Sequence, residues 1–132
     1  MSPRLHLRFE DWPLAICRLD PTSAVPAWAA MGPFTSVTRT PDELSIVTDA
    51  RAVPEVIQAD TGWRAIQLMG PFDFNLVGIM LAVLAPLAEA GVSILAVSTF
   101  DTDYVLVKAA QVDAAIAVLT RAGHAVERGP GL

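Results

Sequence analysis

Along the second half of the chain, apolar residues fall into runs whose lengths match those of strands and helices. Residues 63–69 (WRAIQLM) and 92–100 (VSILAVSTF) predict strands, and a third such run follows at 104–109 (YVLVKA). Residues 74–91 are apolar over too long a stretch for a strand, so they predict a helix that ends at Gly91.

The residues that follow complete a regular order of elements. Residues 111–123 show helical periodicity and end at Gly123, and residues 124–128 form a last short strand. The order strand, helix, strand, strand, helix, strand is that of a split βαβ unit, in which two helices cover one face of an antiparallel sheet. Because proline removes a helical hydrogen bond, Pro86 predicts a mild kink in the first helix.

The first half of the chain repeats this order in a reduced form. Shifted by 60 residues, 37–47 (VTRTPDELSIV) aligns with 97–107 (VSTFDTDYVLV), so that strand, acidic turn and strand stay in register. The helices of this first copy are expected to be short, at residues 23–32 and 51–58.

The pattern therefore predicts an α+β fold of two tandem ferredoxin-like βαββαβ units. The first unit, residues 1–62, is expected to be degenerate, and the second, residues 63–132, to be complete. In both, an antiparallel sheet would be covered by helices on one face.

The amino-acid composition indicates which kinds of molecule the protein can bind. Hydrophobic residues make up 53% of the chain and charged residues 17%, which argues against disorder and favours an apolar face covered in an oligomer. Nine Lys and Arg against 14 Asp and Glu give a net charge of −5, so nucleic acid and anionic membranes are poor partners.

Targeting signals are not expected in this sequence. The single cysteine, Cys17, cannot form an internal disulfide, and the first residues lack the apolar stretch of a secretory signal. Residues 76–88 are uncharged, but a bilayer span needs about 20 residues. We therefore expect a cytoplasmic protein.

Catalytic motifs of the common hydrolase, nucleotide-binding, zinc-protease and dithiol types do not occur. The two histidines, His6 and His124, fall in predicted strands of different repeats, so we expect structural roles for them. We expect Cys17 to be a small buried apolar residue. The expectation is that the protein is not an enzyme and needs no cofactor or metal. A small enzyme acting on an amino-acid derivative is the alternative that this reasoning leaves open.

A loop and a turn offer complementary charges at one end of the predicted second unit. Residues 70–75 precede the first helix, whose free backbone N–H groups favour a carboxylate. Asp73, Asp101 and Asp103 supply the opposite charge, so an amino acid would satisfy both. In the structural alternative, Asp73 or Asn75 caps the helix and Asp101 closes the turn.

Residues 70–124, and above all 85–107 (APLAEAGVSILAVSTFDTDYVLV), resemble the ACT-domain family. The resemblance is to the small bacterial ACT proteins that are similar to each half of the eukaryotic cytosolic arginine sensors. It implies regulatory ligand binding, because ACT domains bind amino acids at an interface between two domains whose second strands pair edge to edge.

The resemblance also implies a set of ligand-binding residues. They lie in the loop before the first helix, in the S-T-F-x-x-D stretch and at the start of the facing domain's second strand: Gly70, Phe72, Asp73, Phe74, Asn75, Leu76, Val77, Thr99, Phe100, Asp103, and Ser93 and Ile94 from the partner. By this motif Asp103 faces the ligand and Asp101 serves the turn. The sensors have a further acid where this chain has Phe74, so the identity of the amino acid stays open.

Two functions follow as competing hypotheses. In the first, the protein is a stand-alone, homodimeric, non-catalytic sensor that binds a free amino acid and acts through an unidentified regulated protein. In the second, it is a structural or protein-interaction module without a small-molecule ligand, and its paired strand edges and apolar helix serve only for assembly.

Overall fold

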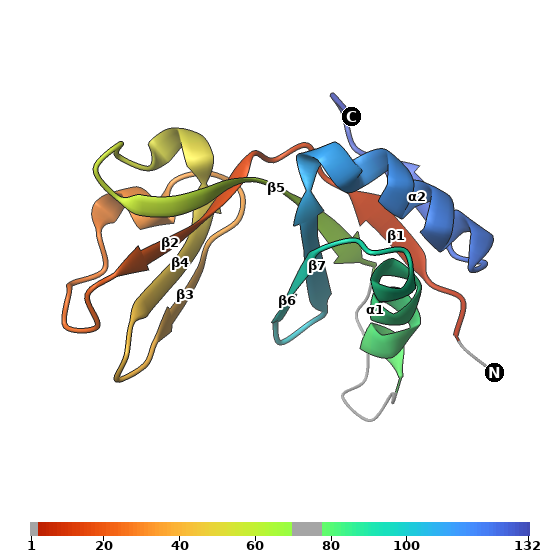
Figure 1. The fold of residues 1–132 in the computed structure, drawn as a ribbon, viewed down its shortest axis with the longest axis horizontal. Coiled ribbons are helices and arrows are strands. Elements are labelled where there is room, and N and C mark those ends of the chain that lie inside the picture. Colours follow the sequence, from red (N-terminus) through yellow and green to blue (C-terminus); the bar gives the residue numbers. More distant parts are fainter. Residues whose placement is uncertain (1–2, 70–77) are drawn as a thin grey trace. The chain divides into compact units, whose positions relative to one another are not determined.

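The computed structural model describes residues 3–69 and 78–132; residues 1, 2 and 70–77 lie outside the described part (Figure 1). The chain forms two compact units. One, the helical unit, comprises Met1–Asp11 together with Arg64–Leu132, and the other, the 12–63 unit, comprises Trp12–Trp63. This division differs from the expected 1–62 and 63–132, because the first eleven residues pack with the second half of the chain.

The helical unit contains the elements expected from residue 63 onward. In chain order they are the last residues of β5 (Gln58–Leu68), then α1 (Ile79–Glu89), β6 (Ile94–Ser98), β7 (Asp103–Lys108), the 3₁₀ turn η3 (Ala109–Gln111), α2 (Val112–Arg121) and β8 (Ala125–Arg128). The described part of the first helix begins after Gly78, whose φ of 89° only glycine adopts readily. The order of strands and helices is thus confirmed.

The N-terminal strand β1 (His6–Phe9) changes the sheet of the helical unit. It pairs antiparallel with β5 and parallel with β8, while β7 pairs with both β5 and β6. The strand order is therefore β8-β1-β5-β7-β6, and the sheet is mixed. The expectation of a purely antiparallel sheet was wrong at this point, because β1 lies between the first and last strands of the repeat.

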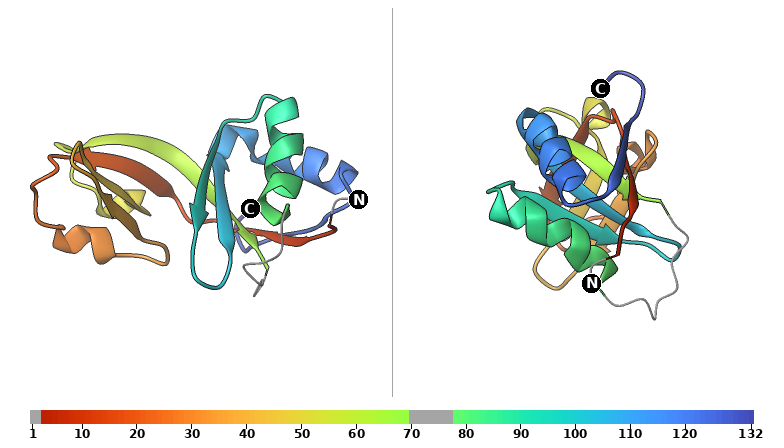
Figure 2. Two further views of the ribbon diagram at one scale, coloured as in Figure 1. Left: turned by 90° about the horizontal axis from the view of Figure 1, so that it is seen from below. Right: turned by 90° about the vertical axis from the view of Figure 1, so that its right-hand side faces the viewer.

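The core of the helical unit explains why β1 takes this position. Leu7 and Phe9 alternate with polar residues on β1 and are fully buried. They join Ile66 and Leu68 of β5 in one apolar cluster with residues of α1 and α2, so both helices lie on one face of this sheet (Figure 2).

A buried histidine, His124, replaces the helical hydrogen bond that Pro86 removes inside α1. Proline has no N–H, so the Ala82 carbonyl loses its helical donor. The Nε2 atom of His124 lies 3.0 Å from that carbonyl oxygen, and the Leu5 N–H donates to Nδ1 of the same ring at 3.1 Å. The ring therefore carries its proton on Nε2 and satisfies two buried backbone groups, which confirms the structural role expected for His124.

The 12–63 unit has the same order of strands but only single turns in place of helices. Its elements are β2 (Leu14–Leu19), the 3₁₀ turn η1 (Ala27–Ala30), β3 (Ser36–Arg39), β4 (Leu44–Asp49), the 3₁₀ turn η2 (Ala50–Ala52) and the first residues of β5. The strands lie in the order β3-β4-β2-β5, all antiparallel. The short helices expected at 23–32 and 51–58 are reduced to η1 and η2.

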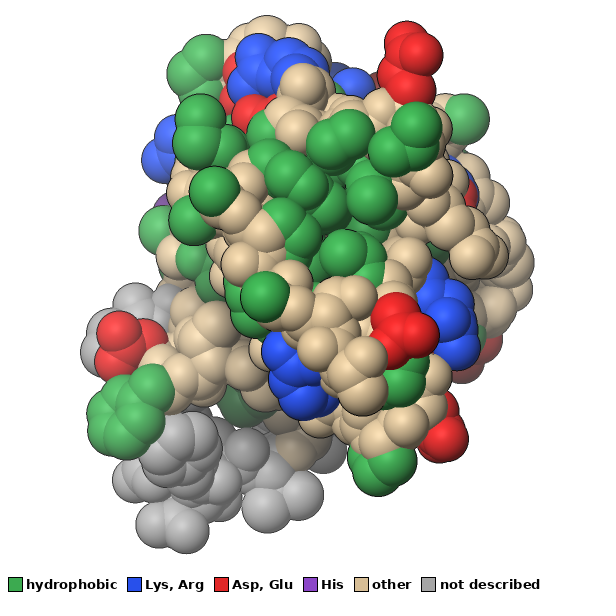
Figure 3. All heavy atoms as spheres, turned by 90° about the vertical axis from the view of Figure 1, so that its left-hand side faces the viewer, with side chains coloured by type: hydrophobic (Ala, Val, Ile, Leu, Met, Phe, Trp, Pro, Cys, Tyr) green, Lys and Arg blue, Asp and Glu red, His purple; other side chains and the backbone are tan. Residues whose placement is uncertain are grey.

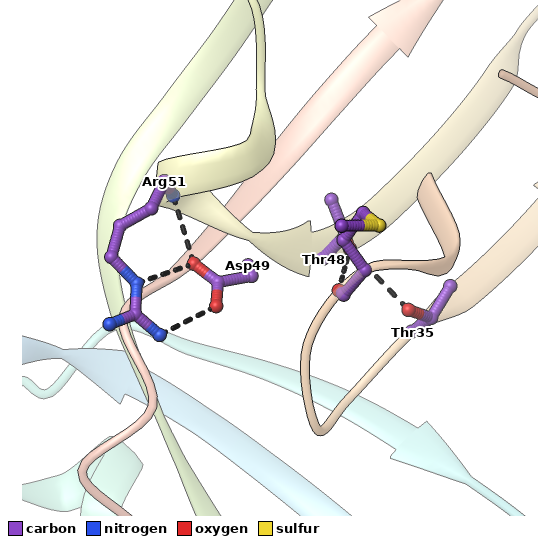
Figure 4. A network of polar contacts seen from close by, with 5 residues as sticks. Thr35, Thr48, Asp49 and Arg51 are labelled. Atoms are coloured by element: carbon purple, nitrogen blue, oxygen red, sulfur yellow. Dashed lines mark hydrogen bonds and ion pairs between the residues drawn. The ribbon is translucent and has the colours of Figure 1, made fainter. Parts of the chain in front are cut away.

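Polar contacts hold the two turns of this unit against β4, and Figure 4 shows four of the side chains involved, those of Thr35, Thr48, Asp49 and Arg51. The buried hydroxyl of Thr48 donates to the Ala29 carbonyl of η1 at 3.0 Å, and the Thr35 hydroxyl donates to the same oxygen at 2.7 Å. At the start of η2, Asp49 accepts hydrogen bonds from both the backbone and the guanidinium of Arg51, which lowers the pKa of the Asp49 carboxyl.

The reduced turns leave apolar side chains exposed on the 12–63 unit. Ala15, Cys17, Leu44 and Ile46 form its buried core, and burial raises the pKa of the Cys17 thiol. Figure 3 shows apolar side chains gathered on one face of this unit. The large apolar residues that it leaves exposed are Val25, Met31, Val37 and Val56.

In the described ranges, none of the helices combines the length and apolar composition needed to cross a bilayer.

An acidic side chain is buried at the end of β1. Glu10 is only 6% exposed, and its carboxylate lies 2.9 Å from Nε of Arg8. Burial raises the pKa of Glu10 above its ordinary value of 4.5, and the Arg8 charge only partly offsets this. Gly129 lies against the same group, since a Cβ there would come within 3.3 Å of Oε2 of Glu10.

We expect the His124 and Pro86 substitutions to be coupled. His124→Ala leaves two buried backbone groups without partners and should lower the free energy of unfolding by about 3 kcal/mol. In a Pro86→Ala background a backbone N–H again reaches the Ala82 carbonyl, so the same substitution should cost about 1 kcal/mol less. Urea denaturation of the four proteins measures the cycle, and equal costs in both backgrounds would contradict the assigned contact.

A second prediction concerns the pH dependence of stability. The folded protein binds a proton at Glu10 more tightly than the unfolded chain does. The stability that Glu10 contributes is thus present below its unfolded pKa of 4.5 and is lost as the pH rises toward the raised value. Glu10→Gln removes this titration, so its free energy of unfolding should rise relative to wild type across that range. Urea denaturation at several pH values checks this, and a difference independent of pH would refute it.

Candidate functional site

The β6–β7 hairpin ends in a turn that two threonines close. The Thr99 N–H and hydroxyl donate to the Thr102 carbonyl at 2.8 and 2.9 Å, and the Thr102 N–H donates back to the Thr99 hydroxyl at 3.2 Å. Asp101 lies exposed between them, and its carboxylate makes no hydrogen bond with any described residue. The turn therefore depends on the threonines and not on the Asp101 side chain.

The same turn is tied to the strand that precedes the first helix. The hydroxyl of Thr102 donates to the Leu68 carbonyl, at the last residue of β5. This contact joins the hairpin to the end of β5, next to the point where residues 70–77 begin. Sequence reasoning missed Thr102, although a threonine inside a tight turn is a common signal for such side-chain contacts.

Asp103 begins β7 on the face of the sheet that carries the helices. It pairs with Ser98 across the hairpin, and it shares its face with Val105 and Val107, two residues further along each time. Both valines are fully buried in the cluster formed with α1 and α2. The partly buried Asp103 thus lies on the helical side, at the end of the sheet where β5 stops.

The other predicted residues are divided between the two ends of β6. Phe100 lies at the hairpin tip and is 83% exposed. Ser93 and Ile94 stand at the opposite end, where the Ser93 N–H donates to Oε1 of Gln111 at 3.1 Å and Ile94 pairs with Val107. Within one chain the structure does not bring Ser93 and Ile94 together with the turn.

Seven predicted residues fall outside the described part of the chain: Gly70, Phe72, Asp73, Phe74, Asn75, Leu76 and Val77. The described chain resumes at Gly78, whose carbonyl accepts the first helical hydrogen bond, from the Ala82 N–H at 3.0 Å. The start of α1 is therefore fixed by Gly78.

Strand β6 forms an edge of the sheet in the helical unit. Its only strand partner among the described residues is β7, which leaves the backbone groups of its outer side without a strand partner there. Leu95 and Val97 on this strand are partly buried. An apolar edge of this kind is a template for pairing with a further strand.

Among residues 3–69 and 78–132, no three His, Cys, Asp or Glu side chains gather closely enough to hold a metal ion.

The tether of Thr102 gives a direct test of this geometry. Thr102→Val removes the hydroxyl that reaches the Leu68 carbonyl and should cost about 1 kcal/mol of stability. It should also speed amide hydrogen exchange at residues 99–102, whereas Thr102→Ser keeps the hydroxyl and should not. Exchange measured by mass spectrometry decides between these, and unchanged protection in the valine variant would contradict the contact.

Comparison with known proteins adds a family assignment. Residues 58–121 match the model of the ACT domain, and residues 13–56 match a second model described as an N-terminal domain. The crystal structure of protein Atu0741 from Agrobacterium tumefaciens is 40% identical, with a TM-score of 0.92, and the match covers 97% of this chain and 96% of that one.

Two further relatives are more distant. The cytosolic arginine sensor for mTORC1 subunit 1 from Bos taurus is 30% identical over 99 residues, which is 67% of this chain but only 30% of the sensor's length. The regulatory subunit of aspartate kinase from Thermus thermophilus is 14% identical with a TM-score of 0.56, covering 85% and 93% of the two chains, a likeness of fold alone. The match over residues 58–121 and the likeness to the arginine sensor show that this part of the chain belongs to the ACT-domain family.

Proposed function

We propose that this protein is a regulatory, non-catalytic sensor that binds a free amino acid in its ACT domain. In this proposal the ligand lies at the end of β5, between the start of α1 and the β6–β7 turn. The ligand carboxylate meets backbone N–H groups at the start of the helix, and its ammonium group meets Asp103. The bovine relative carries the name of an arginine sensor, which supports this class of ligand.

The observation that carries the proposal is the Thr102 contact with Leu68. It holds the hairpin against the end of β5, while the alternation along β7 turns Asp103 toward the helical face of the sheet. The carboxylate of Asp103 is thereby available on the same side as the start of α1. Asp101, two residues earlier, is exposed in the turn.

A homodimer would complete the site. If the β6 edges of two copies pair antiparallel, the start of β6 in one copy lies beside the end of β6 in the other. Ser93 and Ile94 of the second copy would then approach Ser98 and Thr99. The position of β6 at the edge of the sheet supports this arrangement. Because Ser93 and Ile94 lie at the far end of β6 from the turn, only a second copy of the chain could bring them to the turn.

The proposal extends to the rest of the chain. We infer that the 12–63 unit is a degenerate copy of the ACT domain, since its strand order follows that of the helical unit once β1 is set aside. The sensor would work in the cytoplasm and would pass its signal to a regulated protein that is not yet identified.

One observation favours the second candidate function, a protein-interaction module. The 12–63 unit leaves Val25, Met31 and Val56 exposed, the last of them to 92%. Figure 3 shows apolar side chains gathered on one face of this unit, a feature typical of surfaces that bind other proteins.

A thermal-shift panel of the twenty amino acids separates the two functions. For the sensor, at least one amino acid should stabilise the protein, by about 2.7 kcal/mol when it is present at about 100 times its Kd. Asp103→Ala should abolish this shift while the protein stays folded. Asp101→Ala removes the same charge from the exposed turn, so it serves as the matched control and should keep the shift.

Light scattering on the same samples reports the oligomeric state. A dimer whose stability rises with the ligand agrees with the proposal. If no amino acid moves the melting temperature at millimolar concentration, or if Asp103→Ala and Asp101→Ala behave alike, the proposed site is wrong and the interaction module is favoured.

A further inference from the structure

The 12–63 unit has a hollow on the face of its sheet that is turned away from η1 and η2. The hollow has a volume of about 210 Å³ and is lined by residues of β2 and β5 and of the start of β4. Cys17 and Ile46 point into the core of the unit, so their neighbours Arg18 and Ser45 face the opposite side. Strand register sets Arg18 between Ser45 on β4 and Gln58 on β5.

A bulge in β5 lies at the edge of the hollow. Leu14 pairs with Trp63 and Ile16 pairs with Asp60, so β5 contains one residue more than β2 between these two pairs. Gly62 lies in this extra stretch with a φ of 82°, a conformation that favours glycine. A bulge bends and twists its strand, which accounts for a depression on an otherwise regular sheet.

The polar groups around the hollow have hydrogen-bonding capacity to spare. Within the described part of the chain, the side chains of Glu43, Ser45 and Gln58 make no hydrogen bond or ion pair. The guanidinium of Arg18 donates from Nη2 to the Asp42 carbonyl at 3.0 Å, which leaves its other donors for a ligand. One cation, the two carboxylates of Glu43 and Asp60, a hydroxyl and an amide thus surround an apolar floor that includes Ile16.

We propose that this hollow binds a second free amino acid, independently of the ACT-domain site. The guanidinium of Arg18 would pair with the ligand carboxylate, and the carboxylate of Glu43 with its ammonium group. Asp60 also lines the hollow, but it already has a partner within the chain, so Arg18 and Glu43 are the two charged groups assigned to the ligand.

The size of the hollow fits such a ligand. Buried cavities of about 150 Å³ hold a molecule as large as benzene, and this hollow is larger. Small-ligand sites combine an apolar floor with a few convergent polar groups, as here. L-lysine is therefore a suitable probe, with cadaverine, which lacks the carboxylate, and norleucine, which lacks the side-chain charge, as comparison compounds.

Chemical-shift titration of the full chain by NMR tests the proposal. L-lysine should shift the backbone amides of Ser45, Gln58 and Ala59, and cadaverine and norleucine should each bind more weakly. Glu43→Gln should weaken lysine binding at these amides by about tenfold or more, since a charge-assisted contact is lost. Asp42→Asn removes the adjacent charge, which does not line the hollow, and should leave binding unchanged.

The outcomes separate this site from the ACT-domain site. Shifts in residues 45 and 58–59 that persist in an Asp103→Ala variant support the hollow even if the proposed sensor function fails. Shifts confined to residues 98–103 would overturn the hollow while leaving the sensor proposal intact. Equal weakening by Glu43→Gln and Asp42→Asn would also overturn it, because only the overall charge would then matter.

Discussion

The insertion of β1 between β5 and β8 is the constraint on which the helical unit depends. Three residue pairs join β1 to β5, and four join it to β8. Leu7 and Phe9 thereby enter the centre of the core beneath both helices, and the Leu5 backbone reaches His124. Without this strand, β5 and β8 would each lose a hydrogen-bonded neighbour, and the apolar cluster would lose Leu7 and Phe9. The first eleven residues therefore belong to the same compact unit as most of the ACT domain.

The position of the candidate ligand site follows from this sheet. Strand β5 ends at Leu68, and Thr102 binds the carbonyl of that residue, so the hairpin turn is fixed to the strand end. The pleat of β7 then decides which of the two acids lies on the face of the sheet that carries the helices. Asp103 shares its face with Val105 and Val107 and lies on the helical side, whereas Asp101 is exposed in the turn.

The two units show what shortening the helices does to a similar sheet. In the helical unit, α1 and α2 cover one face and bury a large core. In the 12–63 unit, the turns η1 and η2 cover a smaller core built around Ala15, Cys17 and Ala29, and polar contacts from Thr48 and Asp49 hold the turns in place. This unit also leaves Val25, Met31, Val37 and Val56 exposed. A separate feature, the bulge in β5, lies beside its polar hollow.

The sequence alone determined the order of elements from residue 63 onward, because apolar periodicity and the glycines at helix ends are local signals that survive in any packing. It also indicated the hairpin of β6 and β7 and the reduced character of the first half. The tertiary structure decided three features. It placed β1 inside the second unit. The pairing of β1 with β8 joins residues more than a hundred positions apart, and no local sequence pattern indicates it. It showed that His124 donates a hydrogen bond to the Ala82 carbonyl, which Pro86 leaves without a helical donor. It tied Thr102 to Leu68, a contact that requires the folded sheet to bring two separate segments together.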